Sequence, residues 1–303
     1  MISSTLEVPG ATLSTVRWEP EGEPRALIQL VHGMAEHIRR YDYVAKAFCK
    51  AGFLVFGHDI RGHGQSAKPN ELGHMGPWNT VVEDIRRVGD HERKKHPDLP
   101  MALLAHSMGS FMAQQLILDA PEHAAAWILS GSNGKPPAIA AAGRLVARFE
   151  RWRVKPSKPS NLLQNLSFGK FNDAFEGRTE SDWLSRDDAQ VDAYIADPHC
   201  GFGISTESWV GLLDALGPIS DPFRQRRIPE ELPVFIVGGG EDPVSEKGKG
   251  LRQLKGAYDD AGLKNVTLSI HEGARHEILN ETNRDDVIDE LITWTTENLG
   301  LEA

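Results

Sequence analysis

The stretch Met101-Ala-Leu-Leu-Ala-His-Ser-Met-Gly-Ser-Phe111 decides the fold of this chain of 303 residues. It opens with an apolar run that predicts a buried strand, and the residues after it predict a helix. A chain that passes so abruptly from strand to helix can hold the residue at the apex, Ser107, in a strained backbone conformation. The residues two positions away must then be small, as Ala105 and Gly109 are. We therefore predict a sharp turn that exposes the Ser107 hydroxyl as a candidate nucleophile; a polar helix cap is the simpler alternative.

Short apolar runs alternate with longer amphipathic stretches on both sides of this turn. The runs predict strands at Ala26–Val31, Phe53–Phe56, Met101–Ala105, Ala124–Leu129, Pro233–Val237 and Val266–Ile270. The amphipathic stretches predict helices at Tyr41–Ala51, Trp78–His96, Phe111–Leu118, Leu251–Ala261 and Asp285–Leu299. This alternation is typical of an α/β fold, in which helices cover both faces of a mostly parallel sheet. Such sheets bind ligands at the carboxyl ends of their strands.

Residues 132–219 interrupt the alternation. The stretch opens near Gly134-Lys-Pro-Pro137 and closes near Gly217-Pro218. It is too long for a loop within a compact domain. We predict an inserted, mainly helical cap over residues 132–219, between two parts of an α/β core at residues 1–131 and 220–303.

A nucleophilic serine needs a base, and the base needs an orienting carboxylate. The loops after the last two predicted strands supply both residue types, in the chain order serine, acid, histidine that this fold requires. We select Asp242 as the acid and His276 as the base. The alternatives are Glu241, which we expect to be solvated, and His271, which adjoins its strand and is expected to be structural.

The loop His32-Gly33-Met34 follows the first buried strand. A loop at that position can present a backbone N–H to a developing oxyanion, with a second N–H from the residue after the nucleophile. The predicted donors are Met34 and Met108. Another polar loop, His58–Ser66, is expected to be a structural turn in which Asp59 or Arg61 joins neighbouring loops.

Composition and competing motifs exclude several classes of protein. Asp and Glu outnumber Lys and Arg by 43 to 33, which argues against a nucleic-acid partner. Two distant cysteines, Cys49 and Cys200, give neither a disulfide framework nor zinc-ligand spacing, and Cys200 is expected to be a buried free thiol. His271-Glu272 and His276 miss the spacing of a zinc helix by one residue, so no metal is expected. No signal peptide, membrane span or lipidation motif is evident, and we expect a cytoplasmic protein, with transient contact to membranes left open.

With these residues in hand, the chain resembles the α/β-hydrolases of the monoacylglycerol lipase and lysophospholipase group. The resemblance covers nearly the whole chain, and its most specific parts are His32–His37 with Arg40-Tyr41, His58–Ser66, the turn around Ser107, and Glu272–Glu277. Family members usually have glycine where this chain has Ala105. The resemblance implies a Ser107–His276–Asp242 triad, Met34 and Met108 as oxyanion donors, and an acyl-enzyme mechanism that needs no cofactor.

The leading hypothesis is hydrolysis of monoacylglycerols or similar single-chain lipid esters. The alternatives are a lysophospholipase, a short-chain carboxylesterase, and a non-catalytic protein that keeps the fold as a ligand-binding module.

The predicted cap contains a helix, Ala138–Lys155, with apolar residues at helical spacing. We expect Leu145, Phe149 and Trp152 to form the wall or mouth of a substrate pocket. Residues 135–158 also carry seven basic side chains and one acid, Glu150. The basic face is either simply solvated or contacts a membrane or micelle surface. The oligomeric state stays open.

Overall fold

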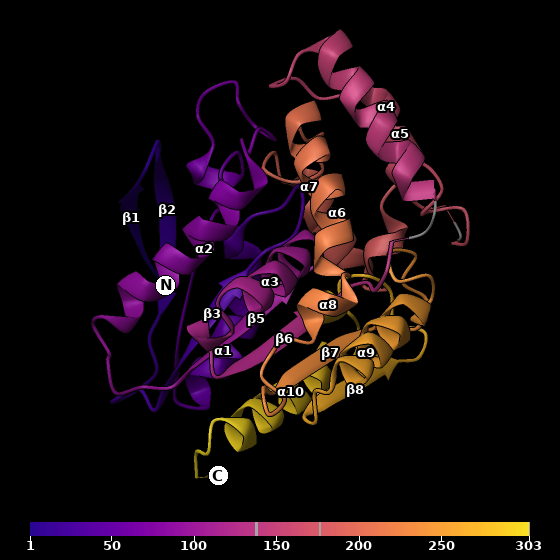
Figure 1. Cartoon of the computed structure of the whole chain (residues 1–303). Helices are drawn as coiled ribbons and strands as arrows, with labels where there is room; N and C mark the ends of the chain where they lie inside the picture. Colours follow the sequence, from indigo (N-terminus) through magenta and orange to yellow (C-terminus); the bar gives the residue numbers. More distant parts are fainter. Residues whose placement is uncertain (137–138, 176, 303) are drawn as a thin grey trace.

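The computed structural model describes residues 1–136, 139–175 and 177–302. An eight-stranded sheet with the order β1-β2-β4-β3-β5-β6-β7-β8 runs through the molecule (Figure 1). The strands are β1 (Ile2–Val8), β2 (Ala11–Trp18), β3 (Ala26–Val31), β4 (Phe53–His58), β5 (Met101–His106), β6 (Ala126–Ser130), β7 (Val234–Gly239) and β8 (Val266–His271). Strands β3 to β8 pair in parallel, which confirms the predicted fold class.

The antiparallel hairpin β1–β2 was not predicted from the sequence. It joins the sheet through β2, which pairs antiparallel with β4. Strand β1 lies at the edge and is largely exposed, so its sequence ISSTLEV contains no buried apolar run. An edge strand with both faces near water lacks the hydrophobic pattern that reveals a strand.

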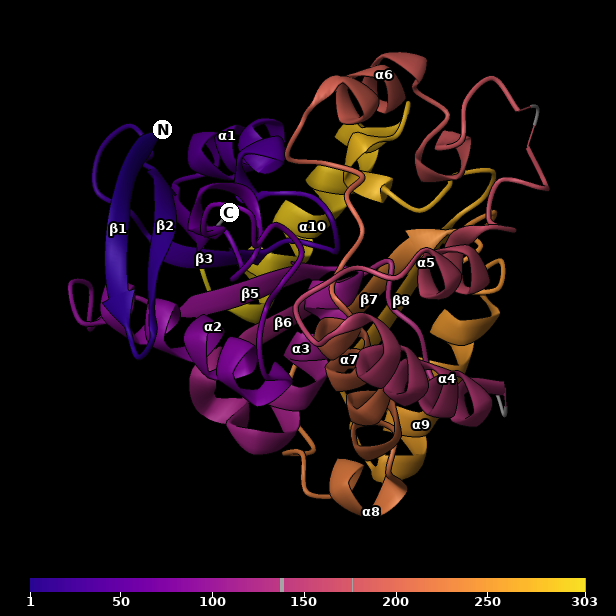
Figure 2. The ribbon, with the colours of Figure 1, turned by 90° about the horizontal axis from the view of Figure 1, so that it is seen from above.

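Helices cover both faces of the sheet, as Figure 2 shows from above. The helices of the core are α1 (Asp42–Lys50), α2 (Trp78–Arg93), α3 (Met108–Asp119), α9 (Lys249–Ala261) and α10 (Arg284–Asn298). Successive residues of a strand face opposite sides, so Leu27 joins the apolar cluster beneath α2, α3 and α9, whereas Ile28 joins the cluster beneath α1 and α10. Both residues are fully buried. The carboxyl ends of the parallel strands therefore meet at one edge of a well-packed sheet.

The described part of the chain between β6 and β7 folds into helices. They are α4 (Ile139–Val154), α5 (Asn161–Phe168), α6 (Asp188–Ala196), α7 (Thr206–Ile219) and α8 (Pro222–Gln225). In Figure 1, α4 and α5 stand apart from the sheet, and α7 lies between them and the core helices. Helix α7 packs against α3 and α2 as well as α4. The division into a core and a cap at residues 132–219 stays a prediction, and Ala138, the predicted start of the first cap helix, lies outside the described residues.

Helix α4 does not present the face that the sequence led us to expect. Leu145, Phe149 and Trp152 are 68%, 54% and 80% exposed, so they do not pack inward. The buried positions are Ala147 and Glu150, whose carboxylate accepts hydrogen bonds from Arg153 and Ser160. Ala147, the paired Glu150 carboxylate and the partly buried Val146, which packs against the core, therefore lie on the inward side, and Leu145, Phe149 and Trp152 lie outside. Among the residues that the structure describes, no helix is both long and apolar enough to cross a lipid bilayer.

Candidate active site

Ser107 lies at the turn between β5 and α3. Its backbone has φ +52° and ψ −121°, a conformation that L-residues rarely adopt. The turn brings the start of α3 against the end of β3: a Cβ atom on Gly109 would lie 2.5 Å from the carbonyl oxygen of His32. Glycine is therefore required at this position, as the spacing of the motif predicts. The strain holds the Ser107 hydroxyl at the carboxyl edge of the sheet.

Three predicted site residues meet at this edge. The Ser107 hydroxyl donates to Nε2 of His276 over 2.9 Å, and Nδ1 of His276 donates to Oδ1 of Asp242 over 3.0 Å. Asp242 is fully buried, and Oδ1 also accepts the backbone N–H of Val244 at 2.8 Å. Burial disfavours the charged form of His276, but the Asp242 carboxylate outweighs it, and the pKa of His276 lies above its ordinary value. This is the geometry of an activated nucleophile, a base and an orienting acid.

The two rival residues lie elsewhere. Glu241 pairs with Lys247 at 2.6 Å on the surface. His271 Nε2 lies 3.1 Å from the carboxylate of Glu290 on α10. Neither is placed to serve Ser107.

Met34 and Met108 both line the cavity that contains Ser107. The backbone N–H of Met108 opens α3, so no carbonyl within the helix is available to it. The two residues reach the cavity from the loop after β3 and from the helix after β5, and their role as oxyanion donors stays a prediction.

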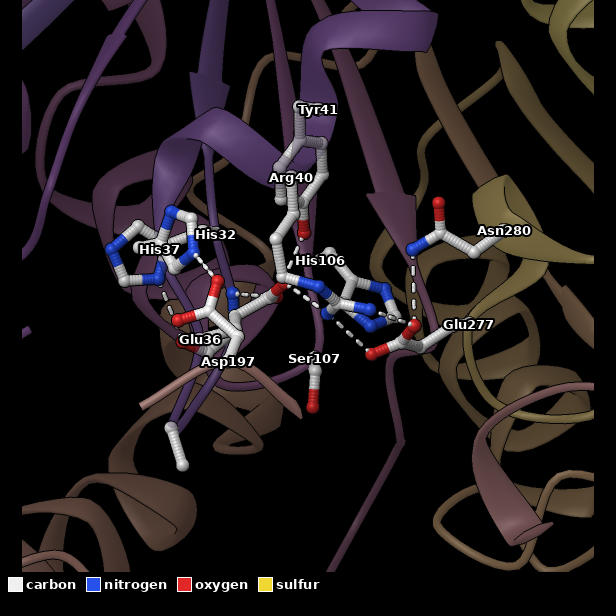
Figure 3. Close-up of polar contacts among 12 residues, drawn as sticks. His32, Glu36, His37, Arg40, Tyr41, His106, Ser107, Asp197, Glu277 and Asn280 are labelled. Carbon is white, nitrogen blue, oxygen red and sulfur yellow. Dashed lines mark hydrogen bonds and ion pairs between the residues drawn. The ribbon is translucent and has the colours of Figure 1, made fainter. Parts of the chain in front are cut away.

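A buried ionic network joins the loop after β3 to the loop that carries His276 (Figure 3). Glu36 accepts hydrogen bonds from the backbone N–H of Gly33 at 2.6 Å and from Tyr41 at 2.9 Å. Arg40 bridges Glu36 at 2.8 Å and Glu277 at 2.6 and 2.7 Å. Burial opposes ionisation of Glu277, yet the Arg40 guanidinium holds the pKa of that carboxyl below its usual range. The network fixes the distance between the two loops. Sequence reasoning missed it because Arg40 and Glu277 lie 237 residues apart in the chain.

The segment Trp183–Ser185, which lies between β6 and β7, binds the same loop. The backbone N–H groups of His276 and Glu277 donate to the carbonyl oxygens of Trp183 and Leu184 at 3.3 and 2.7 Å. The Trp183 indole also packs on the His276 ring, with the centroids 5.2 Å apart. No motif in the sequence indicates these contacts, because nearly a hundred residues separate the two segments.

The cavity above Ser107 has a volume of about 430 Å³. Its wall is mostly apolar and aromatic and includes Phe111, Phe168, Trp183, Leu184, Trp209 and Leu212. The polar residues Gln164, Asn165 and Glu180 also line it. Leu145, Phe149 and Trp152 are not among the lining residues, so the prediction that they form the wall is wrong for this conformation; α5, α7 and the segment before α6 provide it instead.

Neutral histidines support the loop after β3. His63 Nε2 accepts the backbone N–H of Ala35 at 3.2 Å, and His32 Nε2 accepts that of Ile60 at 2.9 Å. Burial lowers the pKa of His32 to about 4 and that of His63 to about 3. Asp59 completes the support by accepting the backbone N–H groups of Ile38 and Gln65, so His58–Ser66 is a structural turn as predicted.

We expect the protein to lose stability in mild acid because its buried histidines stay neutral. Histidines of the unfolded chain take up protons below about pH 6.5, whereas the buried histidines of the native protein do so only near pH 3 to 4. Between these pH values, each buried histidine lowers the free energy of unfolding by up to about 1.4 kcal/mol for every pH unit by which the pH falls. His276 acts in the opposite direction, but five residues outnumber it: His32, His58, His63, His106 and His123. Urea unfolding between pH 7.5 and 4.5 measures the slope.

His58 provides the control for this prediction. Burial lowers its pKa to about 3, and its two ring nitrogens have no hydrogen-bond partner among the described residues. His58→Leu should therefore reduce the slope of unfolding free energy against pH by the contribution of about one proton. Replacement of the exposed His91 by Gln should not change this slope. An unchanged slope in His58→Leu would contradict the assignment.

Comparison with known proteins agrees with this geometry. Residues 22–283 match the family model of the serine aminopeptidases S33. The chain is 30% identical to a monoacylglycerol lipase of Mycolicibacterium smegmatis, covering 99% of this chain and 100% of that protein, and 31% identical to the monoglyceride lipase of Homo sapiens, covering 92% and 85%. A carboxyl esterase from Bacillus coagulans superposes with a TM-score of 0.91 at 25% identity over 98% of each chain. The chain therefore belongs to the serine aminopeptidase S33 family of α/β-hydrolases.

Proposed function

We propose that this protein is a serine ester hydrolase that cleaves monoacylglycerols and similar single-chain lipid esters. The observation that carries the proposal is the hydrogen-bonded series Ser107–His276–Asp242 at the base of a largely apolar cavity. The names of the relatives, monoacylglycerol lipase and monoglyceride lipase, support the substrate class.

Catalysis begins with attack of Ser107 Oγ on the ester carbonyl while His276 takes the serine proton. The N–H groups of Met34 and Met108 stabilise the tetrahedral oxyanion, and Asp242 stabilises the imidazolium. His276 then protonates the departing glycerol oxygen, which leaves an acyl-enzyme. Water, activated by the same imidazole, releases the fatty acid and restores Ser107.

The cavity suits a substrate with one apolar arm and a small polar head. Its aromatic and aliphatic wall can bury an acyl chain, which contributes about 0.8 kcal/mol per methylene group. Gln164, Asn165 and Glu180 supply hydrogen-bonding groups for a polyol. The proposal is tested by measuring kcat/KM for monoacylglycerols, lysophospholipids and acetate esters; the highest value should be for a monoacylglycerol of medium or long chain.

Three other outcomes would redirect the assignment. A preference for lysophospholipids would favour a lysophospholipase activity. The chain is similar to a probable lysophospholipase L2 of Haemophilus influenzae, with 24% identity over 87% of this chain and 80% of that protein. A preference for acetate esters would indicate a general carboxylesterase. Failure to react with a fluorophosphonate would leave only a ligand-binding role.

The exposed face of α4 and α5 is proposed to contact lipid surfaces that present the substrate. Leu145, Phe149 and Trp152 on α4 are joined by Leu162 and Leu166 on α5, which are 45% and 65% exposed. Large exposed apolar patches mark interaction sites. The arginines of α4 are less available to anionic lipid than the sequence suggests, because Arg144 and Arg148 both pair with Asp214.

We expect the triple variant Leu145→Ser, Phe149→Ser, Trp152→Ser to lose affinity for lipid vesicles by at least about tenfold, because burying each side chain contributes about 1.5–3 kcal/mol. Hydrolysis of dispersed acetate esters and of monomeric longer-chain esters should be unchanged, since the three residues lie outside the cavity. Sedimentation with vesicles and activity on vesicle-borne monoacylglycerol measure the effect.

The matched control is the double variant Ile195→Ser, Phe223→Ser. These residues are 52% and 78% exposed but belong to α6 and α8. Equal loss of vesicle binding in both variants would show that general surface hydrophobicity, and not the face of α4 and α5, mediates contact.

A further inference from the structure

A cluster of three potential metal ligands lies where the cap meets the loop after β3. His37 Nε2 and Asp197 Oδ2 are 2.8 Å apart, and Figure 3 shows the two side chains together. The Cys200 thiol completes the cluster: one donor atom from each residue lies within 4.8 Å of the other two. The backbone N–H of Gly201 donates to the carbonyl oxygen of Ala35 at 2.9 Å, which holds the two segments together.

We infer that the His37–Asp197–Cys200 cluster binds a soft divalent cation of the Zn²⁺ class. Thiolate, imidazole and carboxylate together form the donor set that Zn²⁺ prefers, whereas Mg²⁺ and Ca²⁺ require oxygen ligands. Ligands about 2.0–2.3 Å from a tetrahedral ion lie roughly 3.3–3.8 Å from one another. The Cys200 thiol therefore needs to approach the other two donors by at most about 1 Å, and His37 Nε2 and Asp197 Oδ2, which are 2.8 Å apart, must separate by about 0.5 Å. Water can occupy the fourth position.

The local charge favours a cation at this site. The carboxylates of Glu36 and Glu277 lie near Cys200, and Arg40 makes its ion pairs with these two carboxylates. Asp197 adds a third carboxylate within the cluster, beside His37. Three acids and one base leave a net negative environment.

Binding replaces a proton by the metal ion. The S–H bond of Cys200 breaks, a sulfur–metal bond forms, and one proton is released to solvent. His37 coordinates through Nε2 as the neutral imidazole, and Asp197 exchanges its hydrogen bond with His37 for a bond to the ion. All three residues are partly exposed, so an ion can enter from water.

A bound ion would connect two segments that the backbone joins only weakly. His37 follows the loop that carries Met34, and Asp197–Cys200 belong to the cap loop after α6. Occupancy should therefore stabilise the closed contact between cap and core. The site is separate from Ser107, and the inference does not depend on the proposed esterase activity.

Titration of the apo protein with Cd²⁺, a spectroscopic substitute for Zn²⁺, tests the inference. We expect an ultraviolet sulfur-to-cadmium charge-transfer band that saturates at one ion per chain in the wild type and in Cys49→Ser. Cys49 is the matched control because it is the second free, partly buried thiol. Cys200→Ser should lose the band, and His37→Gln and Asp197→Asn should each weaken binding at least tenfold. Zn²⁺ should displace Cd²⁺ and raise the melting temperature of the wild type and Cys49→Ser, but not of Cys200→Ser.

Three results would overturn the inference: no band in the wild type, a band that survives in Cys200→Ser, or a Cys200-dependent band insensitive to both His37→Gln and Asp197→Asn. The last would indicate a lone thiol rather than a three-ligand site. Asp197→Asn keeps the shape of the side chain, so it remains informative if His37→Gln disturbs the loop, and circular dichroism of each apo variant verifies its fold.

Discussion

Replacement of Ser107 by alanine is expected to abolish ester hydrolysis, with turnover falling by about 10⁴-fold or more. The reason is that Ser107 Oγ is the only proposed nucleophile, and neither His276 nor the oxyanion donors can form the acyl-enzyme without it. Initial rates with a monoacylglycerol, together with labelling by a fluorophosphonate, measure the loss. Near-normal turnover in this variant would remove Ser107 from the mechanism.

A second variant separates loss of chemistry from loss of fold. Ser107→Gly should be equally inactive, yet more stable than the wild type to heat. Glycine adopts the backbone conformation at φ +52° without the strain that a Cβ atom imposes, which costs about 1–3 kcal/mol for other residues. An inactive but stabilised Ser107→Gly protein would show that the fold stores strain in order to present the hydroxyl.

Replacement of Asp242 by asparagine is expected to reduce turnover by about 10⁴-fold while substrate binding is preserved. The asparagine amide can donate to Nδ1 of His276, which would place the imidazole proton on Nε2 and prevent it from accepting the proton of Ser107. Loss of the negative charge should also lower the pKa of His276. Single-turnover kinetics and the pH dependence of kcat/KM measure both effects.

Glu241→Gln is the matched control for this experiment. Glu241 adjoins Asp242 in the chain but pairs with Lys247 at the surface, so its replacement should leave turnover unchanged. Severe loss in Glu241→Gln together with a mild effect in Asp242→Asn would show that the wrong acid was selected.

The core strands could be predicted from the sequence because burial on both faces leaves nearly continuous apolar runs, as in Ala26–Val31, where only Gln29 is polar. The positions of Ser107, Asp242 and His276 followed from the same pattern, since each follows a predicted strand and parallel strands bring those loops to one edge. Local sequence also sufficed for the turn at Ser107, where the need for small neighbours is a short-range steric effect.

Contacts that depend on the packing of distant segments could not be predicted. Helical spacing showed that Leu145, Phe149 and Trp152 share one face of α4, but not whether that face turns inward. The answer depended on Glu150, a residue that is buried only because Arg153 and Ser160 satisfy its carboxylate. The ion pair between Arg40 and Glu277 could not be predicted either, since the two residues are distant in the chain and become neighbours only after the sheet forms.

The backbone hydrogen bonds that Trp183 and Leu184 accept from the His276 loop have a consequence for how such enzymes can diverge. The segment 182–185 supports the loop that carries His276, the proposed base, so the region between β6 and β7 is not an interchangeable module. A chimera that receives this region from a relative would inherit new substrate contacts and, at the same time, a new support for its histidine. Helix α4 provides none of the residues that line the cavity, whereas Phe168 at the end of α5 stacks on Trp183 with the ring centroids 6.0 Å apart. Variation in substrate range should therefore accumulate at the cavity-lining positions of α5 and α7 that do not contact Trp183, whereas segment 182–185 and the loop that it supports must change together.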